Sequence, residues 1–268
     1  MVFITMNKFK LHPTFLVVIL FSILLGLLNE MFAILLAFLI HELGHLIFIK
    51  LSDRKVNGIT LYPFGGIIDY QQTNDFLYKE ILISLGGIIL NYIFFKLFLI
   101  CRLYLLANIN YFLFVINLLT MYPLDGGRVM VYLLSFFLPY KLSKFICVTL
   151  SIVISCALLV FFTFNYNGYY LLIILLVFLK INFDNLRYLK KEYHQFILLK
   201  HLYPNTSFKE KLTKIWSNDP VGNLFYQRKM IYDYKEFVVK EEDVLTKFFK
   251  NKKWKLKLAF IFHFVVFI

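Results

Sequence analysis

Three long uncharged runs, at 11–29, 103–124 and 145–179, constrain this chain most. Each is close to or above the roughly 20 residues that a helix needs to cross a bilayer. The composition agrees, with 60% hydrophobic and only 17% charged residues, because about a quarter of a soluble domain is charged. The sequence therefore excludes a soluble enzyme, a disordered chain and a disulfide-stapled secreted domain.

The predicted fold is an all-α polytopic membrane protein with about six transmembrane helices. The spans are expected at about 13–29, 31–50, 79–101, 106–124, 145–163 and 169–183, the fourth continuing as a helix to about 138. The last two share one uncharged run and are separated by a turn-forming cluster at 165–168. Segment 52–78 is too polar to span, and its proline and glycines at 63–66 predict a small membrane-associated β-hairpin, with a re-entrant loop as the alternative.

The distribution of basic residues predicts the orientation. Alternate loops carry the lysines and arginines, namely Lys8, Lys10, Lys50, Arg54, Lys55, Lys141, Lys144 and the C-terminal region. By the positive-inside rule both termini are cytoplasmic. The net charge is +13, and a basic excess beside apolar spans is typical of contact with anionic lipid. A lipid bilayer is therefore the expected partner, and no nucleic acid is expected.

Residues 186–255 have the composition of a small α+β cytoplasmic domain. We expect a capped helix over 208–216, strands at 223–227 and 237–239, and a helix over 241–249. This pattern faintly resembles a degenerate single CBS domain, and a generic docking domain is the alternative. So small a domain should lean on the membrane domain or on a second copy, which leaves a homo-oligomer open. The apolar tail at 256–268 is too short to span and predicts an interfacial anchor.

The motif His41-Glu42-Leu43-Gly44-His45 interrupts the second span. Histidines at i and i+4 lie on one helix face, so both imidazoles can reach one metal ion. Glu42 then lies beside the open coordination position of that ion, where it can act as a base for a bound water. Burying such groups in hydrocarbon is costly unless they coordinate or pair. A polar cluster for helix packing, or a proton relay, is the alternative.

Asp125 is the nearest candidate for a third ligand. A lone carboxylate after 22 uncharged residues needs a partner, which a zinc ion with two neutral histidines supplies. Pro123 interrupts the helix and Gly126-Gly127 allow close backbone approach, so the carboxylate can reach a site on another helix. Asn117, two turns earlier, is expected on about the same face. The alternative is that Asp125 caps a helix in water.

Together, His-Glu-x-x-His in an early span and Asn-x5-Pro-x-Asp-Gly in a later one resemble the site-2 proteases, peptidase family M50. The resemblance points to the stage IV sporulation protein FB subgroup, which releases a membrane-tethered sigma factor precursor, and covers residues 1 to about 185. It implies that His41, His45 and Asp125 bind zinc and that Glu42 is the catalytic base. It also implies that Asn117 and Pro123 lie near the substrate cleft.

Two positions depart from the family's pattern. The family's Gly-Pro-x-x-Asn motif in the third span matches Gly86 to Asn91 without its proline, and Thr120 stands where the family often has proline. Neither change touches a ligand. Asn91 is a candidate substrate-binding residue, with a hydrogen bond between helices as the alternative, and the glycines also suit close helix packing.

The predicted function is therefore an intramembrane zinc metalloprotease of the bacterial cell membrane, with one zinc ion per chain and a membrane-tethered protein substrate. One alternative is a six-span metal or proton transporter with the same four residues as its polar pathway. Another is an inactive relative that acts as a membrane binding partner. The adjacency of Glu42 to His41 favours the protease. The substrate's identity and any membrane-embedded regulators are left open.

Overall fold

The computed structural model describes residues 4–6, 9–62, 65–71, 76–164, 169–203, 209–214, 221, 224–226, 228–234 and 237–250. Three predicted features lie outside these residues: the first half of the 63–66 turn, the turn at 165–168, and the apolar tail at 256–268.

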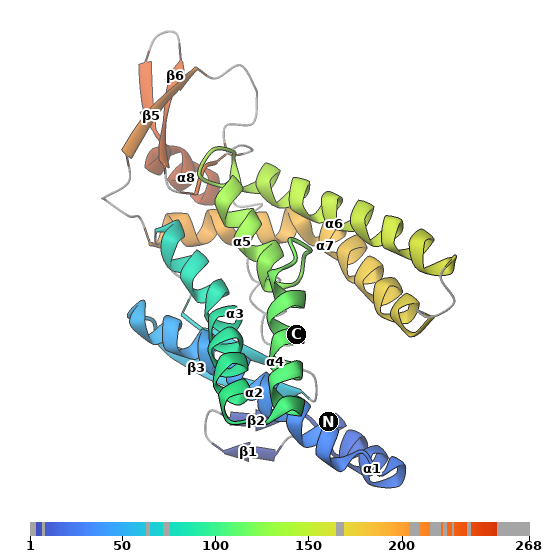
Figure 1. The fold of residues 1–268 in the computed structure, drawn as a ribbon. Coiled ribbons are helices and arrows are strands. Elements are labelled where there is room, and N and C mark those ends of the chain that lie inside the picture. The colour runs from blue at the N-terminus through green and yellow to red at the C-terminus, as the bar shows by residue number, and fades with distance from the viewer. Residues whose placement is uncertain are drawn as a thin grey trace.

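Seven helices lie between Thr14 and Leu202 in the described part of the chain (Figure 1). They are α1 (Thr14–Leu25), α2 (Leu28–Leu51), α3 (Leu77–Ile100), α4 (Tyr104–Leu118), α5 (Asp125–Leu134), α6 (Tyr140–Thr163) and α7 (Tyr169–Leu202). Helix α3 packs against α2, α4 and α5, while α6 and α7 lie side by side and contact the others through α5. The small helix α5 thus lies between the two groups.

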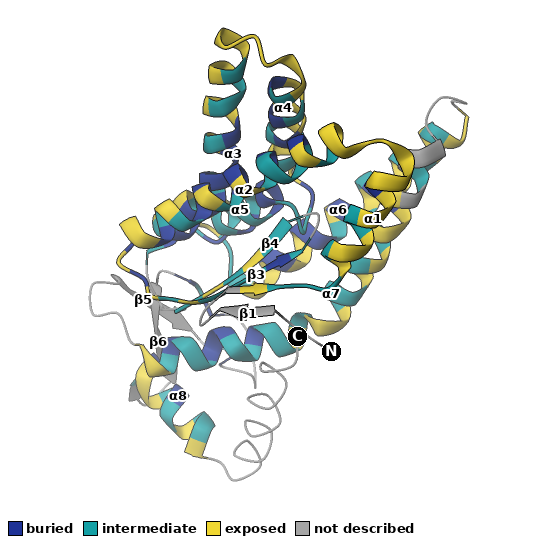
Figure 2. Cartoon of the chain, turned by 90° about the horizontal axis from the view of Figure 1, so that it is seen from below, coloured by how far each residue is buried: buried dark blue, intermediate teal, exposed yellow. Residues whose placement is uncertain are grey.

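Three of these helices, α2, α3 and α6, are long and apolar enough to cross a membrane, and α1 and α4 are apolar but shorter, with 12 and 15 residues. Large apolar side chains such as Leu16, Phe21, Phe112 and Val160 are exposed on their outer faces (Figure 2). Apolar exposure on this scale fits a lipid environment. The count of six spans and the side of each terminus stay predictions.

A four-stranded sheet lies beside α1 and α2. The predicted hairpin is confirmed as β3 (Val56–Tyr62) and β4 (Gly65–Tyr70), which pair antiparallel. Two strands that the sequence did not predict, β1 (Ile4–Met6) and β2 (Phe9–Leu11), extend it in the order β1-β2-β3-β4, with β2 parallel to β3. Strand β4 therefore ends the sheet among the described strands.

The predicted continuous helix from 106 to about 138 is wrong. Helix α4 ends at Leu118, residues 119–124 are not helical, and a separate helix α5 starts at Asp125. Proline at 123 removes a helical N–H and clashes with the preceding turn, which explains the break. Asp125 consequently begins a helix that can take its own direction.

The C-terminal region differs in part from its prediction. Strand β5 (Lys209–Lys214) replaces the helix expected over 208–216, and residues 224–226 are not a strand. The strand forms because it pairs in parallel with β6 (Arg228–Tyr234), a contact that local pattern does not reveal. The predicted strand and helix that follow are confirmed as β7 (Phe237–Lys240) and α8 (Glu241–Lys250). The first helix on which the CBS resemblance rested is therefore a strand over residues 209–214.

The C-terminal region packs against helices α3 and α7. A shared apolar core joins α3 and α7 to it and consists of Leu77, Tyr193, Phe196, Ile197, Val221, Leu224, Tyr226 and Leu245. The Tyr226 hydroxyl donates to Glu80 Oε1 of α3 at 3.4 Å, and burial raises the pKa of the Tyr226 phenol, so it keeps this proton. Glu80 also pairs with buried Arg54 at 2.7 Å.

Candidate metal centre

Helix α2 presents the histidines from a point of very close contact with α3. A Cβ on Gly44 would lie 2.2 Å from the carbonyl oxygen of Gly86, so the two helix backbones touch there. Only glycine on both sides allows this approach. The contact brings α3 directly against the helix face that carries His41 and His45, and it bears out the expected close packing through the paired glycines.

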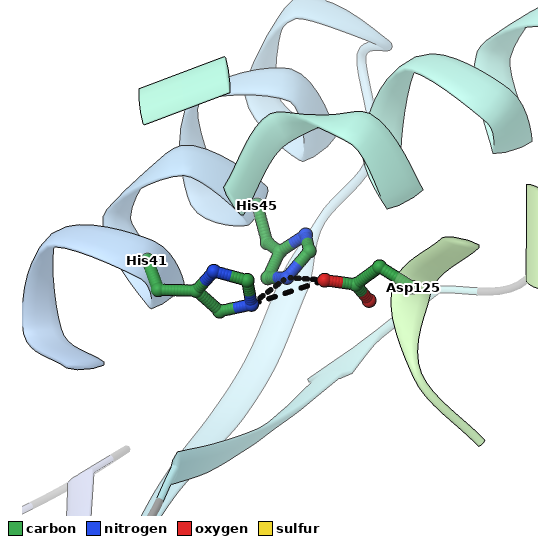
Figure 3. A group of neighbouring side chains, drawn as sticks. All are labelled: His41, His45 and Asp125. Atoms are coloured by element: carbon green, nitrogen blue, oxygen red, sulfur yellow. Dashed lines mark hydrogen bonds and ion pairs between the residues drawn. The ribbon is translucent and has the colours of Figure 1, made fainter. Parts of the chain in front are cut away.

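Three side chains from two helices converge at this point (Figure 3). His41 Nε2 lies 3.0 Å and His45 Nε2 3.2 Å from Asp125 Oδ2, and the two nitrogens are 3.1 Å apart. All three residues are buried, with exposed fractions of 7%, 8% and 6%. The sequence therefore identified a set of residues that the fold does bring together.

Neighbouring groups orient these side chains. His45 Nδ1 is 2.8 Å from the carbonyl oxygen of Ile83, which can only accept, so Nδ1 carries the proton and the Nε2 lone pair faces Asp125. Gly87 lies flat against the His41 ring, where a Cβ would be 2.5–2.7 Å from three ring atoms. Arg128 Nη1 lies 3.8 Å from the second carboxylate oxygen, Asp125 Oδ1.

The arrangement fits a zinc ion. Zn–N and Zn–O distances of about 2.0–2.2 Å in a tetrahedron place ligand atoms roughly 3.3–3.5 Å apart, close to the 3.0–3.2 Å found here. Asp125 Oδ2 is buried and no hydrogen-bond donor among the described residues is aligned with it. An unsatisfied buried carboxylate oxygen beside an imidazole lone pair is unfavourable unless a cation lies between them. Two imidazoles and a carboxylate are also a common catalytic zinc set.

Glu42 lies next to this group and points toward the sheet. Its Oε1 accepts a hydrogen bond from the Gly66 N–H of β4 at 2.8 Å. Glu42 also lines an apolar cavity of about 220 Å³, together with Leu11, Phe15, Leu35, Phe38, Leu39, Leu61, Tyr62 and Gly65. The predicted base thus sits between the metal-binding group and the end strand of the sheet.

The three candidate substrate residues lie on α4, on the connection before Asp125 and on α3. Asn117 is half-buried near the end of α4 and donates to the carbonyl of Leu113 at 3.1 Å. Its expected shared helix face with Asp125 is wrong, because α4 ends at Leu118. Pro123 lies in the connection before Asp125. Asn91 is fully buried on α3, one turn after Gly87, and neither amide atom has a hydrogen-bond partner in the described part of the chain.

Sequence reasoning missed two residues that contact the connection before Asp125. The main chain of Tyr122 is hydrogen-bonded to Ser151 of α6 and to Asn182 of α7. A polar side chain inside an apolar span was the available signal, since such residues rarely occur there without a partner. The partner itself could not be read from the sequence, because it lies 29 and 60 residues away.

The chain is similar to known proteins in sequence and in fold. Residues 30–105 match the model of peptidase family M50. The chain is 26% identical over 144 residues to stage IV sporulation protein FB of Bacillus subtilis, a match that covers 50% of each chain, so it spans about half the length of that relative. Its fold is similar to that of the site-2 protease from Methanocaldococcus jannaschii, with a TM-score of 0.52, 23% identity, and coverage of 68% of this chain and 93% of that one.

Proposed function

We propose that this chain, a member of the site-2 protease family (peptidase family M50), is an intramembrane zinc metalloprotease acting on a membrane-tethered protein. The convergence of His41, His45 and Asp125 within 3.2 Å, with Glu42 adjacent, carries the proposal. A transporter needs polar groups spread along a path, whereas these ligand atoms share one point.

His41 Nε2, His45 Nε2 and Asp125 Oδ2 would hold one zinc ion per chain. When bound, the metal supplies Lewis-acid polarisation of the attacking water and of the scissile carbonyl. The Ile83 carbonyl keeps the His45 Nε2 lone pair available, and Gly87 leaves room for the His41 ring. Hydrogen bonds to the outer nitrogen of a ligating histidine generally raise its basicity and fix its orientation.

Glu42 is the proposed general base. Its carboxylate takes a proton from the water as the water oxygen attacks the peptide carbonyl carbon, and it delivers that proton to the leaving nitrogen as the C–N bond breaks. The Gly66 N–H holds the carboxylate at the rim of the site. Glu42 also lines an apolar cavity, and apolar surroundings strengthen electrostatic interactions.

We propose that the substrate binds as an added strand along β4. A transmembrane helix has all its backbone groups bonded internally, so the cut segment must first unwind, and a sheet edge then satisfies its backbone. Strand β4 ends the described sheet and its Gly66 touches the base. Asn117 and Pro123 are proposed substrate contacts, as is Asn91, whose amide has no hydrogen-bond partner among the described residues.

The finer assignment follows the sporulation relative. We propose that the substrate is a membrane-tethered sigma factor precursor, that the protein lies in a bacterial cell membrane with six spans and both termini cytoplasmic, and that 1–185 is the protease domain. Residues 186–255 would then form the cytoplasmic domain, and the packing of its core against Leu77 of α3 supports an intramolecular docking role.

The substitution Glu42→Gln tests the proposal. Glutamine keeps the size of the side chain but cannot accept the water's proton, so zinc content should stay at one per chain while cleavage of a co-expressed single-span substrate is abolished. Glu30→Gln is the matched control, because Glu30 lies on the same helix and is exposed in its first turn.

Full cleavage by the Glu42→Gln variant would end the assignment of Glu42 as base. A purified wild-type chain that holds no stoichiometric zinc would overturn the metal centre itself.

A further inference from the structure

The connection between α4 and α5, residues 119–124, determines where Asp125 lies. It contacts the first turn of α5 backbone to backbone. A Cβ on Gly126 would lie 2.4 Å from the carbonyl oxygen of Leu119, and one on Gly127 would lie 2.5 Å from the Tyr122 nitrogen. Because no side chain separates them, a shift of the connection moves the start of α5 and with it the Asp125 carboxylate.

Side chains from two other helices hold Tyr122 in this connection. Its N–H donates to Ser151 Oγ of α6 at 2.7 Å, and its carbonyl accepts from Asn182 Nδ2 of α7 at 2.7 Å. The Lys144 ammonium of α6 lies 5.0 Å from the centre of the Tyr122 ring. Both main-chain groups of Tyr122 are therefore bonded to α6 and α7, and not to α4 or α5.

The two hydrogen-bonding side chains are fully buried, each with 0% exposure. Ser151 donates its own proton to the Cys147 carbonyl at 2.7 Å, which leaves its lone pairs for Tyr122. Asn182 uses its second amide proton on the Phe178 carbonyl at 3.0 Å. A buried polar group without a partner costs about 1–3 kcal/mol. Loss of either side chain leaves a main-chain group of Tyr122 without that partner, which favours a shift of the connection.

We propose that Ser151 and Asn182 are positioning residues of the metal centre, which hold the Tyr122 main chain from α6 and α7 and thereby aim Asp125 at His41 and His45. The inference rests on the proposed function, because it takes Asp125 as a zinc ligand. It assigns to α6 and α7 a role in the geometry of a site whose ligands they do not supply.

Zinc affinity and ligand geometry are the readouts. Ser151→Ala and Asn182→Leu should each raise the zinc dissociation constant of the full-length protein by about 10-fold or more, the range found when supporting hydrogen bonds of metal ligands are lost. Chelator competition measures the constant. The visible spectrum of the cobalt-substituted protein should also change, because it reports ligand geometry independently of catalysis.

Two matched controls separate positioning from stability. Ser155 lies one turn after Ser151 on α6, is equally buried, and its Oγ has no hydrogen-bond partner among the described residues. Asn110 of α4 is equally buried and donates within its own helix, to the Leu106 carbonyl at 2.8 Å. Ser155→Ala and Asn110→Leu should keep the wild-type zinc constant and cobalt spectrum, whatever their thermal stability.

The outcomes are distinct. Wild-type zinc affinity and cobalt spectrum in both Ser151→Ala and Asn182→Leu would overturn the inference and leave the proposed function intact, whereas a wild-type chain without stoichiometric zinc would overturn both. Where Ser151→Ala fails to fold, Ser151→Cys replaces it, since a thiol is nearly isosteric with the hydroxyl and is a weak acceptor. The same loss of zinc affinity is expected, and an unchanged constant in that variant would overturn the inference.

Discussion

Gly87→Ala should remove zinc from the site by displacing the His41 ring. The added methyl would lie 2.7 Å from His41 Nε2, the proposed ligand atom, and 2.5 Å from Cε1. Ordinary contact begins at 3.4 Å, so the ligand atom must retreat by about 0.7 Å from its present place. Metal–ligand distances tolerate only about 0.2 Å, and the ring cannot retreat that far and still coordinate.

The energetic cost is divided between folding and binding. Overpacking costs about 1–3 kcal/mol, and replacing glycine by alanine inside a helix returns up to about 1 kcal/mol through helix propensity. The folded protein should therefore survive with a modestly lower melting temperature. Zinc affinity should fall by more than about 100-fold, beyond the range for outer hydrogen-bond partners, because a ligand itself moves.

The assay is zinc stoichiometry by metal analysis after dialysis against a graded chelator, with thermal unfolding in detergent measured on the same preparation. Gly86→Ala is the comparison, since its methyl would meet the Gly44 carbonyl at 2.5 Å and the Phe48 ring at 2.8 Å. It overpacks the helix crossing without touching His41. A Gly87→Ala protein with wild-type zinc affinity, or equal losses in both variants, would refute the argument that the ring contact is decisive.

Three further predictions follow. Asn117→Ala should fold and bind one zinc ion with strongly reduced cleavage. Zinc content and cleavage rate are measured on one preparation, and a normal rate per zinc-loaded molecule would exclude the substrate role of Asn117. Reporter fusions should place Arg54 and Lys141 on the same, cytoplasmic side, and opposite sides would contradict the six-span topology. Glu80→Gln leaves buried Arg54 without its counterion and should lower the free energy of unfolding by about 3–5 kcal/mol. Arg187→Gln, in an exposed pair, is the control and should lower it by less than about 1 kcal/mol. Equal melting temperatures of the two variants would show that the buried pair is not needed for stability.

The sequence by itself determined the features that depend on neighbouring residues. Histidines at i and i+4 must share a helix face, so the pairing of His41 with His45 followed from spacing alone. The apolar segments required helices, and α2, α3 and α6 match the spans predicted at 31–50, 79–101 and 145–163 to within a few residues at each end. The turn residues at 63–66 likewise indicated the hairpin β3–β4, because proline and glycine act on the local backbone.

Local pattern failed where pairing with distant residues decides. Lys209–Lys214 is polar and fits a helix as well as a strand, and its parallel pairing with β6 makes it a strand. Strands β1 and β2 have three residues each and depend on pairing, β2 with β3 and β1 with β2. The break after Leu118 had its local signal in Pro123, yet the position at which the helix stopped depended on tertiary contacts.

The metal centre shows the same division. Chemistry singled out Asp125, since a lone carboxylate in an apolar region needs a partner. Only the tertiary structure decided how that carboxylate comes to lie beside the histidines. The backbone contact of Gly44 with Gly86 and the hydrogen bonds of Ser151 and Asn182 to the Tyr122 main chain set this position. These contacts join residues 29 to 60 positions apart, and packing complementarity at such separations leaves no periodic mark in the chain.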